Sequence, residues 1–277
     1  MIQKTVLKFK KAINKMNSKD FNAIALDLFW LHYESNPIYR QFVSNLSLDP
    51  GKICDYREIP HLPISFFKNH DIILDGLDIQ KTFLSSGTTG SYRSKKHIPD
   101  LEFYTYICES AFEANFGSVK NYKHLALLPN YAENKNSSLI CMVNSFMEKS
   151  SINESALYFK EHNKLIDELN ASDNVNIILW GVSFALLDFV EETAYDLSKI
   201  TIIETGGMKG RQREMTRKEL HERIKYFSNA KVIYSEYGMT ELLSQAYTKG
   251  GESFFSPNWM KINIAEINDP LSIEKKS

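Results

Sequence analysis

The chain has 277 residues and a formal net charge of −1; 43% of its residues are hydrophobic and 24% are charged. These values are typical of a globular protein with a sizeable core, and they exclude the strongly basic surface that nucleic-acid binding needs. No stretch approaches the ~18 apolar residues of a membrane span. The Lys-rich amphipathic N-terminus lacks the apolar centre of a signal peptide, so we expect a cytoplasmic protein.

Helical patterns fill residues 1–60. Apolar residues recur at helical spacing over 4–16 and over 19–34, the latter after a Ser18 cap, and a third helix is expected from Pro37 to Leu46. We therefore expect a helical N-terminal part in which these helices pack together.

A proline-broken connector at 59–68 precedes the next regular segments, which are strand-like runs at about 72–74 and 81–84. From residue 100 onward, helical and strand patterns alternate. Helices are expected at about 100–116, 137–148, 161–170, 184–195 and 216–227, and strands at 124–128, 156–159, 175–180, 201–204 and 231–234. This alternation predicts an α/β fold with a mostly parallel sheet flanked by helices. We expect one domain over 1–277, with its α/β core at 61–262 and a polar tail at 263–277.

A loop rich in glycine and hydroxyl residues follows the strand-like run at 81–84. Its residues are Ser85, Ser86, Gly87, Thr88, Thr89 and Gly90. The glycines allow backbone N–H groups to turn toward one point, and the hydroxyls add donors around it, which favours binding of an anion. Arg93, Lys95 and Lys96 would complement phosphate charge. A plain turn with solvated cations is the alternative, because neither the Walker nor the dinucleotide glycine spacing is present.

Two further loops follow expected strands: Gly206 and Gly207 come after the strand at 201–204, and Tyr237 and Gly238 follow the one at 231–234. Ligands collect at the carboxyl ends of strands in parallel sheets, so we expect these loops and the 85–90 loop to form one site. A simple exit from strand to turn is the alternative for the glycine pair.

At SSGTTG (85–90) and YGMTE (237–241) the chain resembles the adenylate-forming enzymes, which activate a carboxylate with ATP and release pyrophosphate. The closer resemblance is to the acyl-protein synthetases of the bacterial bioluminescence fatty-acid reductase and to phenylacetate-CoA ligases. It extends over LPISFFK (62–68), LLPNYAENKNSSLICMV (127–143), WGVSFALLDF (180–189), ETGGMKGR (204–211) and SEYGMTELLSQAY (235–247).

The resemblance implies a role for each motif. The 85–90 loop would lie over the ATP phosphates with Lys95 nearby, and Gly206 and Gly207 would lie against the adenine. Tyr237 would stack on the base, followed by Gly238 and Met239. Thr240 would bind the α-phosphate, and Glu241 would bind Mg²⁺. A flat ring, a hydroxyl donor and a hard oxygen ligand suit these tasks.

The implied activity is that of an AMP-forming ligase. A carboxylic acid, expected to be a long-chain fatty acid, becomes an acyl-adenylate and passes to a thiol of a protein or of coenzyme A. The ribose-binding aspartate, the hinge and the small C-terminal domain of the family have no counterpart here. We therefore expect the large N-terminal domain alone, and a nucleotide-binding non-catalytic remnant, or a partial domain that needs another chain, is the alternative.

An α/β-hydrolase or acyltransferase is a second alternative. Ser183 follows a strong strand and opens a helix, as in a nucleophile elbow, and His221 with Glu204 or Asp188 would complete the chain order. His221 lies inside a capped helix rather than on a loop, which argues against this alternative. The sequence names neither the acyl group, nor its acceptor, nor a role for Lys209 and Arg211.

Overall fold

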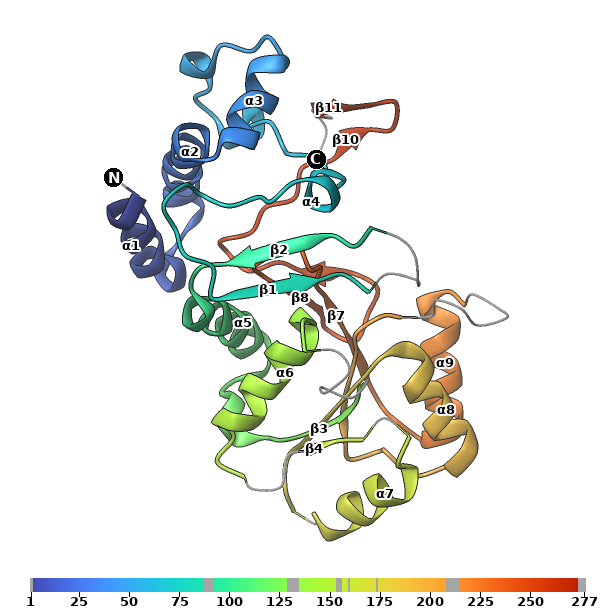
Figure 1. The fold of residues 1–277 in the computed structure, drawn as a ribbon. Helices are drawn as coiled ribbons and strands as arrows, with labels where there is room; N and C mark the ends of the chain where they lie inside the picture. The colour runs from blue at the N-terminus through green and yellow to red at the C-terminus, as the bar shows by residue number, and fades with distance from the viewer. Residues whose placement is uncertain are drawn as a thin grey trace. The chain divides into compact units, whose positions relative to one another are not determined.

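The computed structural model describes residues 2–86, 92–128, 135–152, 156–158, 160–172, 174–207 and 215–273 (Figure 1). The chain divides into two compact units. Unit 1 comprises Met1–Tyr104 and Ser256–Ser277, and unit 2 comprises Thr105–Phe255. The helix α5 (Leu101–Phe116) crosses the boundary between them in sequence.

Unit 1 begins with three α-helices, which the sequence predicted. Its helices are α1 (Ile2–Ala12), α2 (Ser18–Ser35), α3 (Pro37–Asn45) and α4 (Phe66–Asn69), with 3₁₀ turns at Ile13–Lys15, Pro50–Lys52 and Tyr56–Glu58. Asn17, and not Ser18, caps α2: its side chain accepts hydrogen bonds from the backbone N–H groups of Lys19 and Asp20. The prediction of the cap was therefore wrong by one residue.

Two small antiparallel sheets complete unit 1. They pair β1 (Lys81–Leu84) with β2 (Lys95–Ile98), and β10 (Ala265–Glu266) with β11 (Asp269–Ile273). The expected strand at 72–74 is absent from these described residues, because its apolar run has no partner strand. The strand at 81–84 exists, but it does not join the parallel sheet as expected.

Unit 2 contains a seven-stranded sheet in the order β4-β3-β5-β6-β7-β8-β9. Its strands are β3 (Lys123–Leu127), β4 (Ala156–Leu157), β5 (Ile177–Gly181), β6 (Thr201–Glu204), β7 (Ile233–Tyr237), β8 (Ala246–Thr248) and β9 (Phe254–Phe255). The five strands from β4 to β7 pair in parallel, and the last two are antiparallel. The predicted mostly parallel α/β sheet is confirmed.

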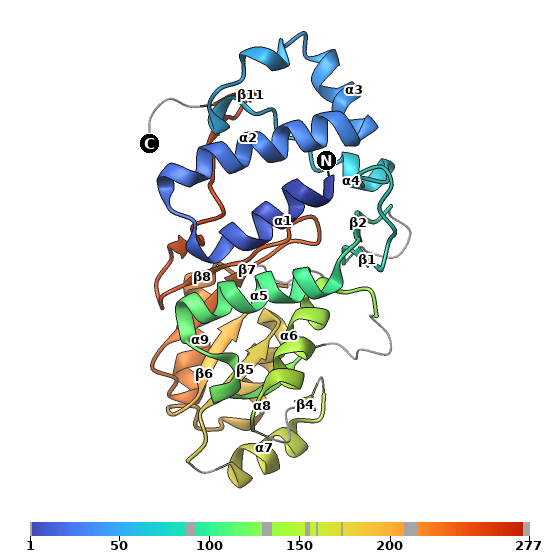
Figure 2. The ribbon, with the colours of Figure 1, turned by 90° about the vertical axis from the view of Figure 1, so that its left-hand side faces the viewer.

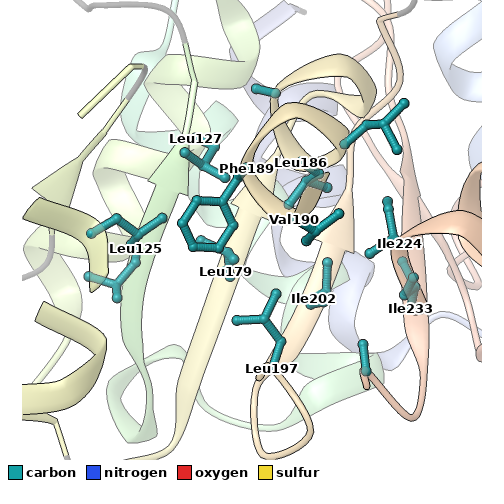
Figure 3. Close-up of a cluster of buried hydrophobic side chains, with 14 of the residues drawn as sticks. Leu125, Leu127, Leu179, Leu186, Phe189, Val190, Leu197, Ile202, Ile224 and Ile233 are labelled. Carbon is teal, nitrogen blue, oxygen red and sulfur yellow. The ribbon is translucent and has the colours of Figure 1, made fainter. Parts of the chain in front are cut away.

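Helices cover both faces of this sheet (Figures 1 and 2). They are α6 (Ser138–Lys149), α7 (His162–Ala171), α8 (Ser183–Thr193) and α9 (Arg217–Ser228), with a 3₁₀ turn at Val119–Asn121. On one face, Phe189 and Val190 of α8 and Ile224 of α9 pack against Leu179 and Ile202 of the central strands (Figure 3). Each such fully buried side chain contributes about 1.5–3 kcal/mol.

The opposite face carries an aromatic layer. Phe112 of α5 lies 5.1 Å, between ring centroids, from Phe146 of α6, and Phe146 lies 5.8 Å from Trp180 of β5. The indole N–H of Trp180 donates to His124 Nδ1 at 3.1 Å, so the polar groups in this layer pair with each other. Burial lowers the pKa of His124 to about 4 and keeps its ring neutral.

The strand β7 pairs with a parallel strand on one side and with an antiparallel strand on the other. Its first residues pair in parallel with β6, ending at the pair Glu204 and Ser235. Its last two residues pair antiparallel with β8, Glu236 opposite Tyr247 and Tyr237 opposite Ala246. The parallel sheet therefore ends where the segment predicted to bind a ligand begins.

Candidate functional site

A cavity of about 330 Å³ in unit 2 lies at the carboxyl ends of β6 and β7. Its lining residues are Ser183, Glu204, Thr205, Gly206, Gly207, Met215, Arg217, Leu220, Glu236, Tyr237, Gly238 and Phe254. Two of the three loops predicted to share a site therefore meet here. Parallel strands bring them together because their ends lie at the same edge of the sheet.

The glycine pair forms one wall of the cavity in a backbone conformation that side chains disfavour. Gly206 has φ +77° and Gly207 has φ +96°. The Gly206 carbonyl accepts a hydrogen bond from the Ser183 N–H at 2.9 Å, and the Thr205 N–H donates to the Gly181 carbonyl at 3.0 Å. These bonds fix the loop to β5 and α8, so the wall is a flat backbone surface in a defined position.

Glu204 is a buried carboxylate beneath that wall. Its Oε1 accepts hydrogen bonds from the Gly206 N–H at 2.6 Å and from the Ser183 hydroxyl. His221 Nε2 lies 3.9 Å from its Oε2, and 3.4 Å from the hydroxyl of Ser235. Burial alone would raise the pKa of Glu204, but the hydrogen bonds outweigh burial and hold it below its usual range. Glu204 is thus a charged group that fixes the glycine loop.

This geometry is not that of a serine hydrolase. Ser183 is buried, and its hydroxyl donates to Glu204 rather than to a histidine. His221 approaches the same carboxylate from its other oxygen. An acid therefore lies between the serine and the histidine, whereas the hydrolase mechanism needs the histidine next to the serine.

Glu236 is a second lining residue that the sequence reasoning missed. Its side chain lies on the face of the sheet that carries Tyr247, because it alternates with Ser235 and Tyr237 along β7. Burial, reinforced by the negative charge of Glu204, raises the pKa of Glu236 to about 8. The group is therefore mostly protonated at neutral pH. The only sequence signal for Glu236 as a site residue was a charged side chain near the end of a strand, directly before Tyr237.

Two aromatic rings, those of Tyr237 and Phe254, line the cavity. Tyr237 is 41% exposed, and its ring centroid lies 5.7 Å from that of Phe254. Its hydroxyl donates to Met239 Sδ at 3.2 Å, and the guanidinium of Arg217 lies 4.5 Å from the centre of the Phe254 ring. An exposed ring beside a flat backbone wall can hold a planar heterocycle. Arg217 and Phe254 were not among the predicted site residues.

Thr240 and Glu241 lie in the turn after β7, where the Leu242 N–H donates to the Met239 carbonyl at 3.1 Å. Both side chains are partly exposed, and neither is among the residues that line the cavity. Their predicted contacts with phosphate and Mg²⁺ stay predictions. Among the described residues, no group of three or more His, Cys, Asp or Glu side chains could hold a metal ion.

The predicted phosphate loop belongs to unit 1. Gly87, Thr88, Thr89 and Gly90 lie outside the described residues, as do Lys209 and Arg211. The Ser85 hydroxyl accepts a hydrogen bond from the Ser94 N–H, and the Ser85 N–H donates to the Ser94 carbonyl, both at 3.0 Å. These bonds continue the β1–β2 pairing to the start of the loop, and Ser86 is exposed there.

Basic side chains gather near the end of β1 and the start of β2 within unit 1. A cavity of about 550 Å³ is lined by Lys68, Asn69, Leu84, Tyr92, Arg93 and Lys95. Lys95 Nζ lies 2.7 Å from Asp71 Oδ1, so part of its charge is already compensated. An anion is the ligand that such a lining favours.

No protein-family model matches the sequence, and no curated protein matches it. Among solved structures, the chain is similar to 2-hydroxyisobutyryl-CoA ligase in complex with 2-HIB-AMP and CoA, with a TM-score of 0.65 and 12% identity over 94% of this chain. A mutant form of coronafacic acid ligase from Pectobacterium brasiliense matches over 52% of this chain and 27% of its own, with 14% identity and a TM-score of 0.36.

The chain spans 58% of the length of the 2-hydroxyisobutyryl-CoA ligase. Among the described residues, no helix is long and apolar enough to cross a membrane. At this identity the likeness concerns the fold, and it agrees with the α/β architecture expected from the sequence. The chain has an α/β fold similar to that of part of 2-hydroxyisobutyryl-CoA ligase.

Proposed function

We propose that this chain is the nucleotide-binding part of an adenylate-forming ligase, which activates a carboxylic acid with ATP to an acyl-adenylate and releases pyrophosphate. The observation that carries the proposal is the meeting of Gly206, Gly207 and Tyr237 around one cavity at the ends of β6 and β7. The similar ligase was solved with 2-HIB-AMP and CoA, and the likeness to it supports the same class of reaction.

The residues around the cavity fit a nucleotide base. The positive φ angles of Gly206 and Gly207 require glycine, and the absence of Cβ atoms leaves a flat wall. The exposed ring of Tyr237 offers a stacking surface.

We also propose Mg²⁺ as a partner of the phosphates. Mg²⁺ usually takes one or two carboxylates together with phosphate oxygens and water, and Glu241 would be the protein ligand. Thr240 would bind the α-phosphate. The 85–90 loop and Lys95 would hold the terminal phosphates, where positive charge stabilises the departing pyrophosphate.

The acid and its acceptor are further parts of the proposal. By resemblance to the acyl-protein synthetases we expect a long-chain fatty acid, passed to a thiol of a protein or of coenzyme A in the cytoplasm. The CoA in the similar ligase supports the second acceptor.

The test is acid-dependent exchange of labelled pyrophosphate into ATP, measured with Mg²⁺ over acids from acetate to myristate. We expect exchange with one class of acid, and a loss of at least about 100-fold in Glu241→Ala. Glu252→Ala, which removes an exposed carboxylate further along the same unit, is the matched control and should retain activity. Absence of exchange with every acid would refute a self-sufficient enzyme. Nucleotide binding without exchange would then favour a partial domain or a non-catalytic remnant.

A further inference from the structure

The Glu204 side chain lines the cavity, and the proposed function gives it no task. It is buried, and its Oε1 accepts hydrogen bonds from the Gly206 N–H at 2.6 Å and from the Ser183 hydroxyl. Acidic side chains are rarely buried unless such bonds hold them. A negative charge here also opposes the binding of an anionic nucleotide. The contribution of Glu204 to the site must therefore come through the groups that it holds.

Gly206 and Gly207, here called the glycine wall, are held through the backbone of Gly206. The Gly206 N–H donates to Glu204, and the Gly206 carbonyl accepts from the Ser183 N–H at 2.9 Å. Gly206 thus keeps no free N–H donor for a ligand. What the glycine wall offers is a flat surface, which suits the face of a planar ring rather than its edge.

The glycine wall does not keep its conformation by itself. Gly206 and Gly207 have φ angles of +77° and +96°, and glycine adopts positive and negative φ about equally readily. If the ligand had to order the wall, the entropy lost on binding would lower the affinity. The hydrogen bond from the Gly206 N–H to Glu204 removes part of that loss, because it fixes the peptide before a ligand arrives.

We propose that Glu204 is a positioning residue for nucleotide binding, which holds the glycine wall in the conformation that stacks on the base. It does so through the reach of its side chain rather than through its charge. The inference rests on the proposed function, which places the adenine against Gly206 and Gly207. On the other side of the carboxylate, His221 Nε2 lies 3.9 Å from Glu204 Oε2 and 3.4 Å from the Ser235 hydroxyl.

Two substitutions of Glu204 separate reach from charge. Glu204→Asp keeps the charge but withdraws the carboxylate by about 1.5 Å, the length of one C–C bond, and so takes it away from the Gly206 N–H. Glu204→Gln loses the charge but keeps an oxygen for the Gly206 N–H, and its amide can donate to His221 or Ser235. Calorimetric titration of the full chain with Mg-ATP should show an affinity at least about tenfold lower in Glu204→Asp, and within about twofold of the original in Glu204→Gln.

Two further variants exclude a general effect of stability. Trp180→Phe destabilises the protein from the opposite face of the sheet, where the indole donates to His124, and should leave the affinity for Mg-ATP within about twofold. Ser183→Ala removes the hydroxyl that holds Glu204 Oε1 and should lower the affinity about three- to tenfold. It also tests the inference if Glu204→Asp does not fold. Each titration is made well below the melting temperature of the variant.

Hydrogen exchange of the full chain without nucleotide measures the fixing of the wall directly. Compared with the amides of β6, the Gly206 amide should exchange at least about tenfold faster in Glu204→Asp. Its relative rate should be unchanged in Glu204→Gln and Trp180→Phe. A residue that only stabilised the fold would change both sets of amides together.

An affinity of Glu204→Asp within about twofold of the original, or an equal fall in Glu204→Gln or Trp180→Phe, would overturn the inference and leave the proposed function standing. Unchanged affinity in Ser183→Ala would do the same if Glu204→Asp does not fold. Absence of Mg-ATP binding in the unaltered chain would overturn both. Weaker binding in Glu204→Asp and Ser183→Ala alone, with faster exchange at Gly206 in Glu204→Asp, supports the inference.

Discussion

The replacement Glu204→Gln should destabilise the protein at neutral pH. The carboxylate accepts hydrogen bonds from the Gly206 N–H at 2.6 Å and from the Ser183 hydroxyl. Hydrogen bonds to a charged group contribute about 1.5–3 kcal/mol, against about 0.5–1.5 kcal/mol for neutral partners. Two weakened bonds therefore amount to about 2 kcal/mol, which relief from burying a charge reduces to about 1–2 kcal/mol.

The pH dependence of this loss follows from the pKa of Glu204, which folding lowers. A carboxyl whose pKa is lowered on folding stabilises the protein above its unfolded pKa of about 4.3, and this contribution is lost as the pH falls through the folded value. The difference in stability between Glu204→Gln and the unaltered chain should therefore be largest near neutrality and shrink below about pH 4.

The assay is urea unfolding at several pH values, with thermal unfolding as a second measure. We expect a decrease in melting temperature of about 2–4 °C per kcal/mol at neutral pH. Glu252→Gln, at an exposed carboxylate, should change neither quantity. Equal stability of Glu204→Gln and the unaltered chain near pH 7, or an undiminished difference in acid, would refute the reasoning.

Three other substitutions test the fold and the cavity. Gly181→Ala places a Cβ 2.5 Å from Leu186 Cγ and should cost about 1–3 kcal/mol in urea unfolding, with partial recovery in the double variant Gly181→Ala/Leu186→Ala; additive losses would contradict the clash. Trp180→Phe leaves His124 without its indole donor and should cost about 2–3 kcal/mol by the same measurement; an unchanged midpoint would contradict the pairing. Tyr237→Leu should weaken ATP binding about 5- to 100-fold in calorimetry, whereas Tyr237→Phe keeps the ring; equal weakening would argue against stacking.

Local patterns predicted the buried strands well. The predicted strand at 201–204 has the same first and last residues as β6, because the apolar Ile202 and Ile203 are flanked by polar residues that mark the strand's ends. The strand before Tyr237 was predicted to end at 234, but β7 continues to 237, since its last residues pair with β8. That pairing depends on residues nine and eleven positions away, which a local pattern does not contain.

From the sequence, site residues could be predicted only where they belong to a recognisable motif. Gly206, Gly207 and Tyr237 were expected near one another and do line one cavity, whereas Glu236 and Phe254 carry no motif. The pairing of Glu204 with Ser235 depends on how β6 and β7 align in the sheet. The expected contribution of the 85–90 loop to the same site stays a prediction.

The two hydrogen-bonding ladders that share β7 have a mechanical consequence for the cavity. The β6–β7 ladder ends at Glu204 and Ser235, so Gly206 and Gly207 extend beyond it. Glu236 and Tyr237 are held instead by β8. The two walls of the cavity thus depend on different ladders: the glycine wall on the pairing of β6 with β7, and Tyr237 on the pairing of β7 with β8.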